Sequence, residues 1–216
     1  MPIAAGGGDR ATALRVIGYG LQRKPNDPWL LTAQARVYMQ IGDFGQAAGI
    51  LNNAVQRATT ADEKRMASYS RGQANFSLGN FQQSADDFDS SMVGLTTTKS
   101  RLEATLWRYA AQVHTKQDAR AILTKDLGNE NLYEWPGPIA KFLLGKMPAG
   151  ELEVAAESDQ TAKSINGKCP AAFYMGMEAQ RRADKQRARE QLQLAQARCP
   201  TTAPFNWAAS AELKRL

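Results

Sequence analysis

Few side chains in this sequence are of a type and spacing that could perform catalysis or bind a metal. The 216 residues include one histidine, His114, and two cysteines, Cys169 and Cys199. Zinc sites need three or four Cys, His or carboxylate ligands, so these residues do not form one. A Cys–His nucleophilic pair would have to use His114. His114 comes near the end of a predicted helix, beside Thr115 and Lys116, which favours a surface or capping role.

The motifs of common catalytic and phosphate-binding sites are absent. The sequence contains no G-x-S-x-G elbow, no G-x-x-x-x-G-K-[ST] loop and no H-E-x-x-H helix. Asp86, Asp87 and Asp89 form an acidic cluster, but neighbouring residues on a helix diverge by about 100°. This cluster is therefore interpreted as a solvated helix face and not as a calcium loop. We expect no catalytic residue, no metal and no cofactor.

The charge balance is basic, with 27 Lys and Arg against 21 Asp and Glu and a net charge of +6. This balance suits an acidic partner, but it also serves solubility. The densest basic run lacks the interleaved aromatic residues of a nucleic-acid site, so no nucleic-acid binding is expected. That run contains Arg181, Arg182, Lys185, Arg187 and Arg189. No apolar run of about 18 residues exists, and the first residues lack the pattern of a signal peptide or a lipid-accepting cysteine.

A ladder of small and apolar residues recurs along the chain. Its copies are Gly42-Asp43-Phe44 with Ala47, Leu51 and Ala54; Gly79-Asn80-Phe81 with Ser84, Phe88 and Ser91; Ala183-Asp184 with Ala188, Leu192 and Ala195; and Gly8-Asp9 with Ala13, Ile17 and Gly20. Ala13 and Ala47 are 34 residues apart, and Ser84 follows Ala47 by 37. Ala188 follows Ser84 by 104 residues, close to three periods, which predicts two degraded repeats between them.

This period resembles that of the tetratricopeptide repeat, in which each unit is helix, turn, helix. Antiparallel helices approach closely only at small side chains, which places Gly72 and Gly176 at the helix crossings, with Phe88 and Leu192 filling the space beside them. In each turn we expect glycine to end one helix and Asp or Asn to cap the next. The fold class predicted is all-α, a right-handed superhelical array of these repeats with a C-terminal capping helix.

The predicted helices and domains follow from this repeat. Helices are expected over residues 9–23, 28–41, 44–58, 62–78, 81–94, 99–115, 117–127, 136–145, 148–164, 170–182, 185–198 and 202–215. The domains expected are a flexible leader (1–8), an N-terminal repeat array (9–127) whose first unit lacks its leading helix, and C-terminal repeats with a capping helix (128–216), stacked on the first array. Because an unpaired first helix exposes an apolar face, we expect the natural protein to extend upstream or a second copy to cover that face.

The second half of the chain carries a more specific resemblance. Its elements are Leu106-Trp107-Arg108-Tyr109, Trp135-Pro136-Gly137-Pro138-Ile139, Phe173-Tyr174-Met175-Gly176 and Ala211-Glu212-Leu213. In this order they resemble the C-terminal half of the NlpI-type tetratricopeptide lipoproteins of Gram-negative bacteria. The resemblance implies a non-catalytic adaptor at the periplasmic side of the outer membrane that brings cell-wall hydrolases to a protease and can dimerise. This chain lacks the lipidated cysteine of that family.

The two cysteines flank the last predicted hairpin. Cys169 precedes its first helix and Cys199 follows its second. Those two ends lie side by side in an antiparallel hairpin, which favours a Cys169–Cys199 disulfide over two buried free thiols. A disulfide indicates an oxidising compartment, here the periplasm.

The first helices of the early hairpins are expected to line a concave groove for a peptide or a partner protein. The outward positions of the first hairpin are Trp29, Thr32, Arg36, Met39 and Gln40, and those of the second are Met66, Tyr69, Gln73, Phe76 and Ser77. Aromatic, Met and Arg side chains are common in protein interfaces. Burial by a neighbouring unit is the alternative, above all for Trp29 and Phe76.

Three functions remain open. The first is a periplasmic or outer-membrane-associated adaptor that binds another protein or peptide and is tethered to a membrane only through a segment missing from this sequence. The second is a regulatory or targeting segment of a larger enzyme. The third is a cytoplasmic secretion chaperone. The sequence does not decide between a monomer and a homodimer.

Overall fold

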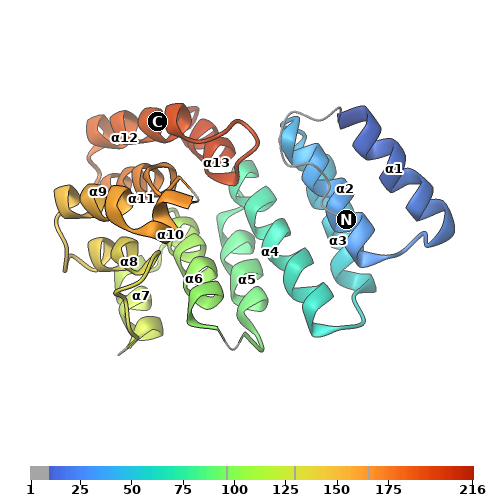
Figure 1. The fold of residues 1–216 in the computed structure, drawn as a ribbon, viewed down its shortest axis with the longest axis horizontal. Coiled ribbons are helices and arrows are strands. Elements are labelled where there is room, and N and C mark those ends of the chain that lie inside the picture. The colour runs from blue at the N-terminus through green and yellow to red at the C-terminus, as the bar shows by residue number, and fades with distance from the viewer. Residues whose placement is uncertain (1–9, 96, 129, 165) are drawn as a thin grey trace. The chain divides into compact units, whose positions relative to one another are not determined.

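The computed structural model of the chain describes residues 10–95, 97–128, 130–164 and 166–216. Every regular element in these ranges is a helix (Figure 1), and helices that follow one another in the chain pack together. The prediction of an all-α fold is therefore confirmed. The leader predicted over residues 1–8 lies outside the described residues. The chain divides into two compact units, Met1–Gly94 and Leu95–Leu216.

The described part of the first unit consists of one helix followed by two helical hairpins. Its helices are α1 (Arg10–Arg23), α2 (Pro28–Gln40), α3 (Phe44–Arg57), α4 (Ala61–Leu78) and α5 (Phe81–Met92). Helix α2 pairs with α3, and α4 pairs with α5, while α4 also contacts α2 and α3. All five helices lie within two residues of the predicted bounds.

The turns between paired helices need a left-handed residue. Gly42 and Gly79 have φ values of +81° and +86°, and Ala183 takes φ +60° at the equivalent place in the last hairpin. Glycine adopts this conformation without strain. Asp43 caps the following helix, accepting a hydrogen bond from the backbone amide three residues later at 3.0 Å. Asn80 makes no such cap, because its side-chain amide contacts α4 instead.

Small residues allow the paired helices to approach closely. A Cβ atom at Gly72 would lie 2.9 Å from the ring of Phe88, and one at Gly176 would lie 2.8 Å from the side chain of Leu192. The Ser84 hydroxyl donates a hydrogen bond to the carbonyl of Gly72 at 2.8 Å, which a larger residue would prevent. The sequence ladder therefore predicted both crossings correctly.

The second unit is less regular than the first. Its helices are α6 (Thr98–Gln112), α7 (Ala119–Leu127), α8 (Gly137–Leu143), α9 (Ala149–Ser158), α10 (Gln160–Ser164), α11 (Lys168–Arg181), α12 (Lys185–Arg198) and α13 (Pro204–Leu213). The single helix predicted over 148–164 is two helices. Asp159 ends α9 in an extended conformation, and its carboxylate then accepts a hydrogen bond from the amide of Ala162.

Helix α11 forms the centre of the second unit. Its residues from Cys169 to Ala179 are all buried, so it is surrounded by protein on every side. The rings of Phe173 on α11, Trp107 on α6 and Phe205 on α13 pack together, with the Trp107 and Phe205 rings stacked at 4.9 Å. These contacts join α6 to the second unit, and α7 packs on α6. The division between the two compact units falls after residue 94, whereas the predicted N-terminal array extended to residue 127.

Candidate functional site

Six residues of the predicted groove lie along one stripe of α2 and one stripe of α4; Trp29, Arg36 and Met66 are exposed, and Gln40, Gln73 and Ser77 are half-buried. On α2, Arg36 and Gln40 point within about 20° of the direction of Trp29, at 100° per residue. On α4, Met66, Gln73 and Ser77 have the same sequence offsets from Gly72 that Trp29, Arg36 and Gln40 have from Ala35 on α2. We call the six residues the α2–α4 stripe: Trp29, Arg36, Gln40, Met66, Gln73 and Ser77. Trp29 is 44% exposed and Met66 is 37% exposed.

Three residues predicted for the groove are instead in the core. Thr32, Met39 and Phe76 are 2%, 1% and 0% exposed. Each is turned by about 60–80° from its stripe, at 100° per residue, and lies against other helices of the unit. The ring of Phe76 packs edge-on against Phe81 at 5.5 Å. The sequence interpretation was wrong here because it assigned too wide an arc of each helix to the surface.

Tyr69 lies between these two groups. Its side chain is half-buried, and its ring meets the ring of Phe88 edge-on with centroids 5.5 Å apart. Phe88 also covers Gly72 at the helix crossing. Tyr69 is therefore part of the packing that joins α4 to α5, and only part of it faces solvent.

A buried carboxylate holds the second hairpin together. Asp87 on α5 is 2% exposed, and the Nε of Arg71 on α4 donates to its two oxygens at 2.9 and 3.1 Å. The side-chain amide of Asn75 donates to the same carboxylate at 2.8 Å, and Arg71 also reaches Asn52 on α3. Asp87 therefore does not belong to the solvated face predicted for the acidic cluster, and its contacts fix α4, which carries half of the stripe.

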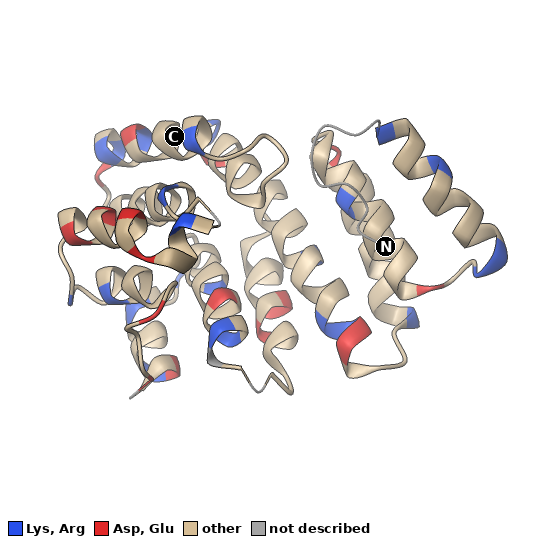
Figure 2. Cartoon of the chain, viewed as in Figure 1, with Lys and Arg blue, Asp and Glu red and all other residues tan. Residues whose placement is uncertain are grey.

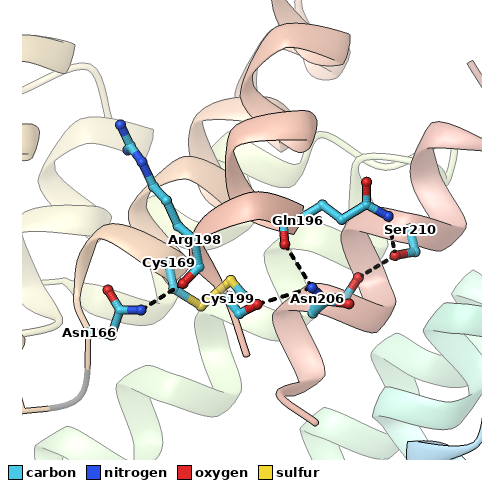
Figure 3. The surroundings of a disulfide bond; sticks show 7 residues. All are labelled: Asn166, Cys169, Gln196, Arg198, Cys199, Asn206 and Ser210. Atoms are coloured by element: carbon cyan, nitrogen blue, oxygen red, sulfur yellow. Dashed lines mark hydrogen bonds between the residues drawn. A yellow bond between two sulfur atoms is a disulfide. The ribbon is translucent and has the colours of Figure 1, made fainter. Parts of the chain in front are cut away.

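The disulfide predicted at the end of the last hairpin is present between Cys169 and Cys199 (Figure 3), with the two Cα atoms 4.8 Å apart. Hydrogen bonds surround it. The side-chain amide of Asn206 donates to the carbonyls of Gln196 and Cys199 at the end of α12, at 2.8 and 3.1 Å. Asn166 likewise donates to the carbonyl of Arg198 at 2.7 Å. These donors satisfy carbonyls that a helix end leaves unpaired.

The α2–α4 stripe has no exposed counterpart on α11. The equivalent positions there are Pro170 and Met177, which are buried, and Arg181, which is half-buried. The surrounding helices of the second unit cover them. The exposed stripe is therefore a property of the first unit.

A second buried carboxylate, Glu178, joins three helices of the second unit. Its side chain is 3% exposed and accepts hydrogen bonds from Tyr109 on α6 at 2.6 Å and from Arg120 on α7 at 2.6 Å. Arg181 and Arg182, one turn further along α11, donate to it at 2.8 and 2.7 Å. Burial raises the pKa of Glu178, but the hydrogen bonds from Arg181, Tyr109 and Arg182 outweigh it and lower the pKa to about 2.

His114, the one histidine, contacts a third buried carboxylate. Its Nε2 lies 2.9 Å from an oxygen of Glu212, a residue that is fully buried. Gln180 and Arg215 donate to Glu212 at 2.8 and 2.6 Å. Burial raises the pKa of Glu212, but the hydrogen bond from His114 and these neighbours lower it on balance. The His114 side chain is 20% exposed, so it is not the surface residue that the sequence suggested, and it ties α6 to α13.

These lowered carboxylate pKa values predict a loss of stability in acid. Because the pKa of Glu178 falls from 4.5 in the unfolded chain to about 2 in the folded one, its contribution is complete above pH 4.5. It is lost as the pH falls toward 2, and it amounts to about 3 kcal/mol. Urea unfolding at several pH values in this range measures the slope of the unfolding free energy against pH. Glu178→Gln should have a shallower slope than the wild type, and equal slopes would contradict the assignment.

The charged residues offer no other obvious chemistry. Within the described ranges, no group of three or more His, Cys, Asp and Glu side chains is placed to bind a metal ion. Both cysteines are bonded to each other, so neither presents a thiol. The basic run reaches α12, which carries Lys and Arg side chains and one acidic residue, Glu190 (Figure 2).

Comparisons of the sequence with protein-family models and with curated proteins find no match. The short elements that carry the resemblance to the NlpI-type lipoproteins lie in the core of the second unit. Trp107 and Phe173 belong to its aromatic cluster, and Glu212 is the buried partner of His114. These residues therefore belong to the packing of the second unit.

Proposed function

We propose that this chain is a non-catalytic protein-binding scaffold of the tetratricopeptide type that works in an oxidising compartment such as the periplasm. Its binding surface is the α2–α4 stripe, and its ligand is a peptide or a segment of a partner protein. The repeated hairpins of the first unit support the superhelical arrangement. The resemblance of the second half supports an adaptor role in the cell envelope.

One observation carries the proposal. A tryptophan that is 44% exposed and an exposed arginine, Trp29 and Arg36, share one side of α2. Trp and Arg are among the residues that contribute most to binding energy in protein interfaces. They sit on a helix that is fixed by its own hairpin and by α4, so little order must be gained on binding.

The disulfide supports the proposed compartment. Disulfides persist in secreted and periplasmic proteins and are rare in the cytosol. The Cys169–Cys199 bond lies at the buried end of the α11–α12 hairpin, where both side chains are 5% exposed or less. Among the described helices, none is both long enough and apolar enough to span a membrane.

Alanine substitution of both Trp29 and Arg36 should abolish most partner binding. Loss of a true interface anchor lowers affinity by about thirtyfold or more, equivalent to about 2 kcal/mol. Both side chains are exposed, so the thermal unfolding midpoint should stay nearly unchanged. Partners captured from a periplasmic extract by the immobilised wild-type chain would be identified, and their affinities for each variant then measured by titration.

Tyr19→Ala with Arg23→Ala provides a matched control for this test. It also removes one exposed aromatic ring and one exposed guanidinium from the first unit, but from α1. Equal losses in the two double variants would show that the α2–α4 stripe has no special role. An unchanged affinity in the Trp29 and Arg36 variant would move the site elsewhere.

A further inference from the structure

A half-open cavity of about 620 Å³ lies within the second unit. Helices α8, α11 and α12 and the connection between α8 and α9 contribute to its walls. Phe142 on α8, Met147 in the connection and Met175 on α11 form an apolar part. The volume is within the range of about 300–1,000 Å³ typical of sites for small ligands.

Cationic side chains also line this cavity. Lys146 and Arg187 are exposed, and among the described residues neither has a carboxylate within ion-pair distance. Asp184 also lines the cavity, and its carboxylate caps α12 by accepting a hydrogen bond from the Arg187 backbone amide at 3.0 Å. Neither Lys146 nor Arg187 therefore has this carboxylate as an ion-pair partner.

A third cation, Arg182, also lines the cavity and is held in place by Glu178. Its Nε donates to Glu178 at 2.7 Å, so among the described residues the terminal nitrogens of its guanidinium have no acceptor. Glu178 also lines the cavity, but Arg120 and Arg181 donate to it as well. Three guanidinium groups thus surround the Glu178 carboxylate, and in the lining the cations Lys146, Arg182 and Arg187 outnumber the carboxylates Glu178 and Asp184.

We propose that this cavity binds an organic acid with an apolar body. The acid group would pair with Lys146, Arg187 and the free nitrogens of Arg182, because guanidinium and ammonium groups bind carboxylates with strong charge-assisted hydrogen bonds. The apolar body would lie on Phe142, Met147 and Met175. A free small acid has this chemistry, and so does an acidic side chain next to leucine in a peptide. The site is in the second unit and does not depend on the α2–α4 stripe.

Two pairs of probes test the chemistry and separate its sources. Octanoate and octanamide share an apolar chain and differ in charge. The blocked pentapeptides Ala-Leu-Asp-Leu-Ala and Ala-Leu-Asn-Leu-Ala provide the same comparison in a peptide. Isothermal titration of the full chain measures each affinity. We expect at least one charged probe to bind about tenfold or more tightly than its neutral analogue, since one strong ionic contact is worth about that factor.

Substitutions locate the binding within the cavity. Lys146→Ala with Arg187→Ala should weaken the charged probe by about tenfold or more. Lys185→Ala with Arg189→Ala removes the same net charge from exposed positions of α12 outside the cavity and should have no such effect. All four side chains are exposed, and far-ultraviolet circular dichroism verifies that both variants are folded.

The outcomes decide the proposal. Tighter binding of octanoate identifies a small acid as the ligand class, and tighter binding of the acidic peptide identifies a protein segment. The proposal is overturned if neutral and charged probes bind equally, or if no probe binds at millimolar concentration. It is also overturned if the two double variants lose affinity to the same extent, because the effect would then come from overall charge.

Discussion

Glu178→Ala is expected to lower the free energy of unfolding by about 3–5 kcal/mol, the range measured when one partner of a buried ion pair is removed. The carboxylate accepts hydrogen bonds from Tyr109, Arg120, Arg181 and Arg182. Without it, the buried hydroxyl of Tyr109 loses its acceptor and several guanidinium groups face one another without a counter-charge. Urea unfolding at neutral pH, followed by circular dichroism, measures the loss.

Glu153→Ala is the matched control, because Glu153 is an exposed glutamate of the same unit. Exposed substitutions usually change stability by about 0.5 kcal/mol or less. A loss of that small size at Glu178 would mean that water replaces the carboxylate and that the cluster contributes little. Glu178→Gln should fall between the two variants, since the amide oxygen still accepts but the charge is gone.

Removal of the disulfide is expected to cost about 3–4 kcal/mol, the chain-entropy value for a loop of this size. Cys169 and Cys199 are 30 residues apart in the sequence. The bond restricts the unfolded chain, so Cys169→Ala with Cys199→Ala should unfold at a lower urea concentration than the oxidised wild type. The hydrogen bonds from Asn206 to the end of α12 remain in the variant and should keep the hairpin folded at neutral pH.

Reduction of the wild type provides the control for this second prediction. The reduced wild type and the double variant should have similar midpoints, because both lack the covalent closure. Thiol titration of the native, unreduced chain should find no free thiol. Two reactive thiols in that experiment would show that the bond does not form, and the argument for an oxidising compartment would then lose its main support.

The sequence predicted the helices and their crossings better than the burial of individual side chains. Gly72 and Gly176 marked the helix crossings correctly because only a residue without a side chain permits such an approach, and this requirement is local. The disulfide was predictable for the same reason, since a hairpin brings its own ends together. Both inferences use residues that belong to a single hairpin.

The candidate site was only partly predictable because burial depends on neighbours that the repeat pattern does not specify. Phe76 and Trp29 were both predicted to line the groove, yet Phe76 is fully buried and Trp29 is 44% exposed. The sequence interpretation assigned no role to Glu178, although a single carboxylate after the apolar run from Phe173 to Met177 was a usable signal. Its partners Tyr109 and Arg120 lie 69 and 58 residues away, and no local rule pairs them.

Those separations affect the order in which the chain can fold. In the first unit each helix packs mainly on the next one, so its hairpins form from residues that are close in sequence. In the second unit, Tyr109 and Arg120 cannot form their hydrogen bonds until Glu178 is present. Closing the long loop between them costs entropy before any contact compensates for it. During synthesis, the first unit emerges with all its partners present, whereas α6 and α7 emerge well before the helix that completes their core. The Glu178 cluster can therefore form only after α11 has emerged, and the contacts of Phe205 and Glu212 on α13 follow later still.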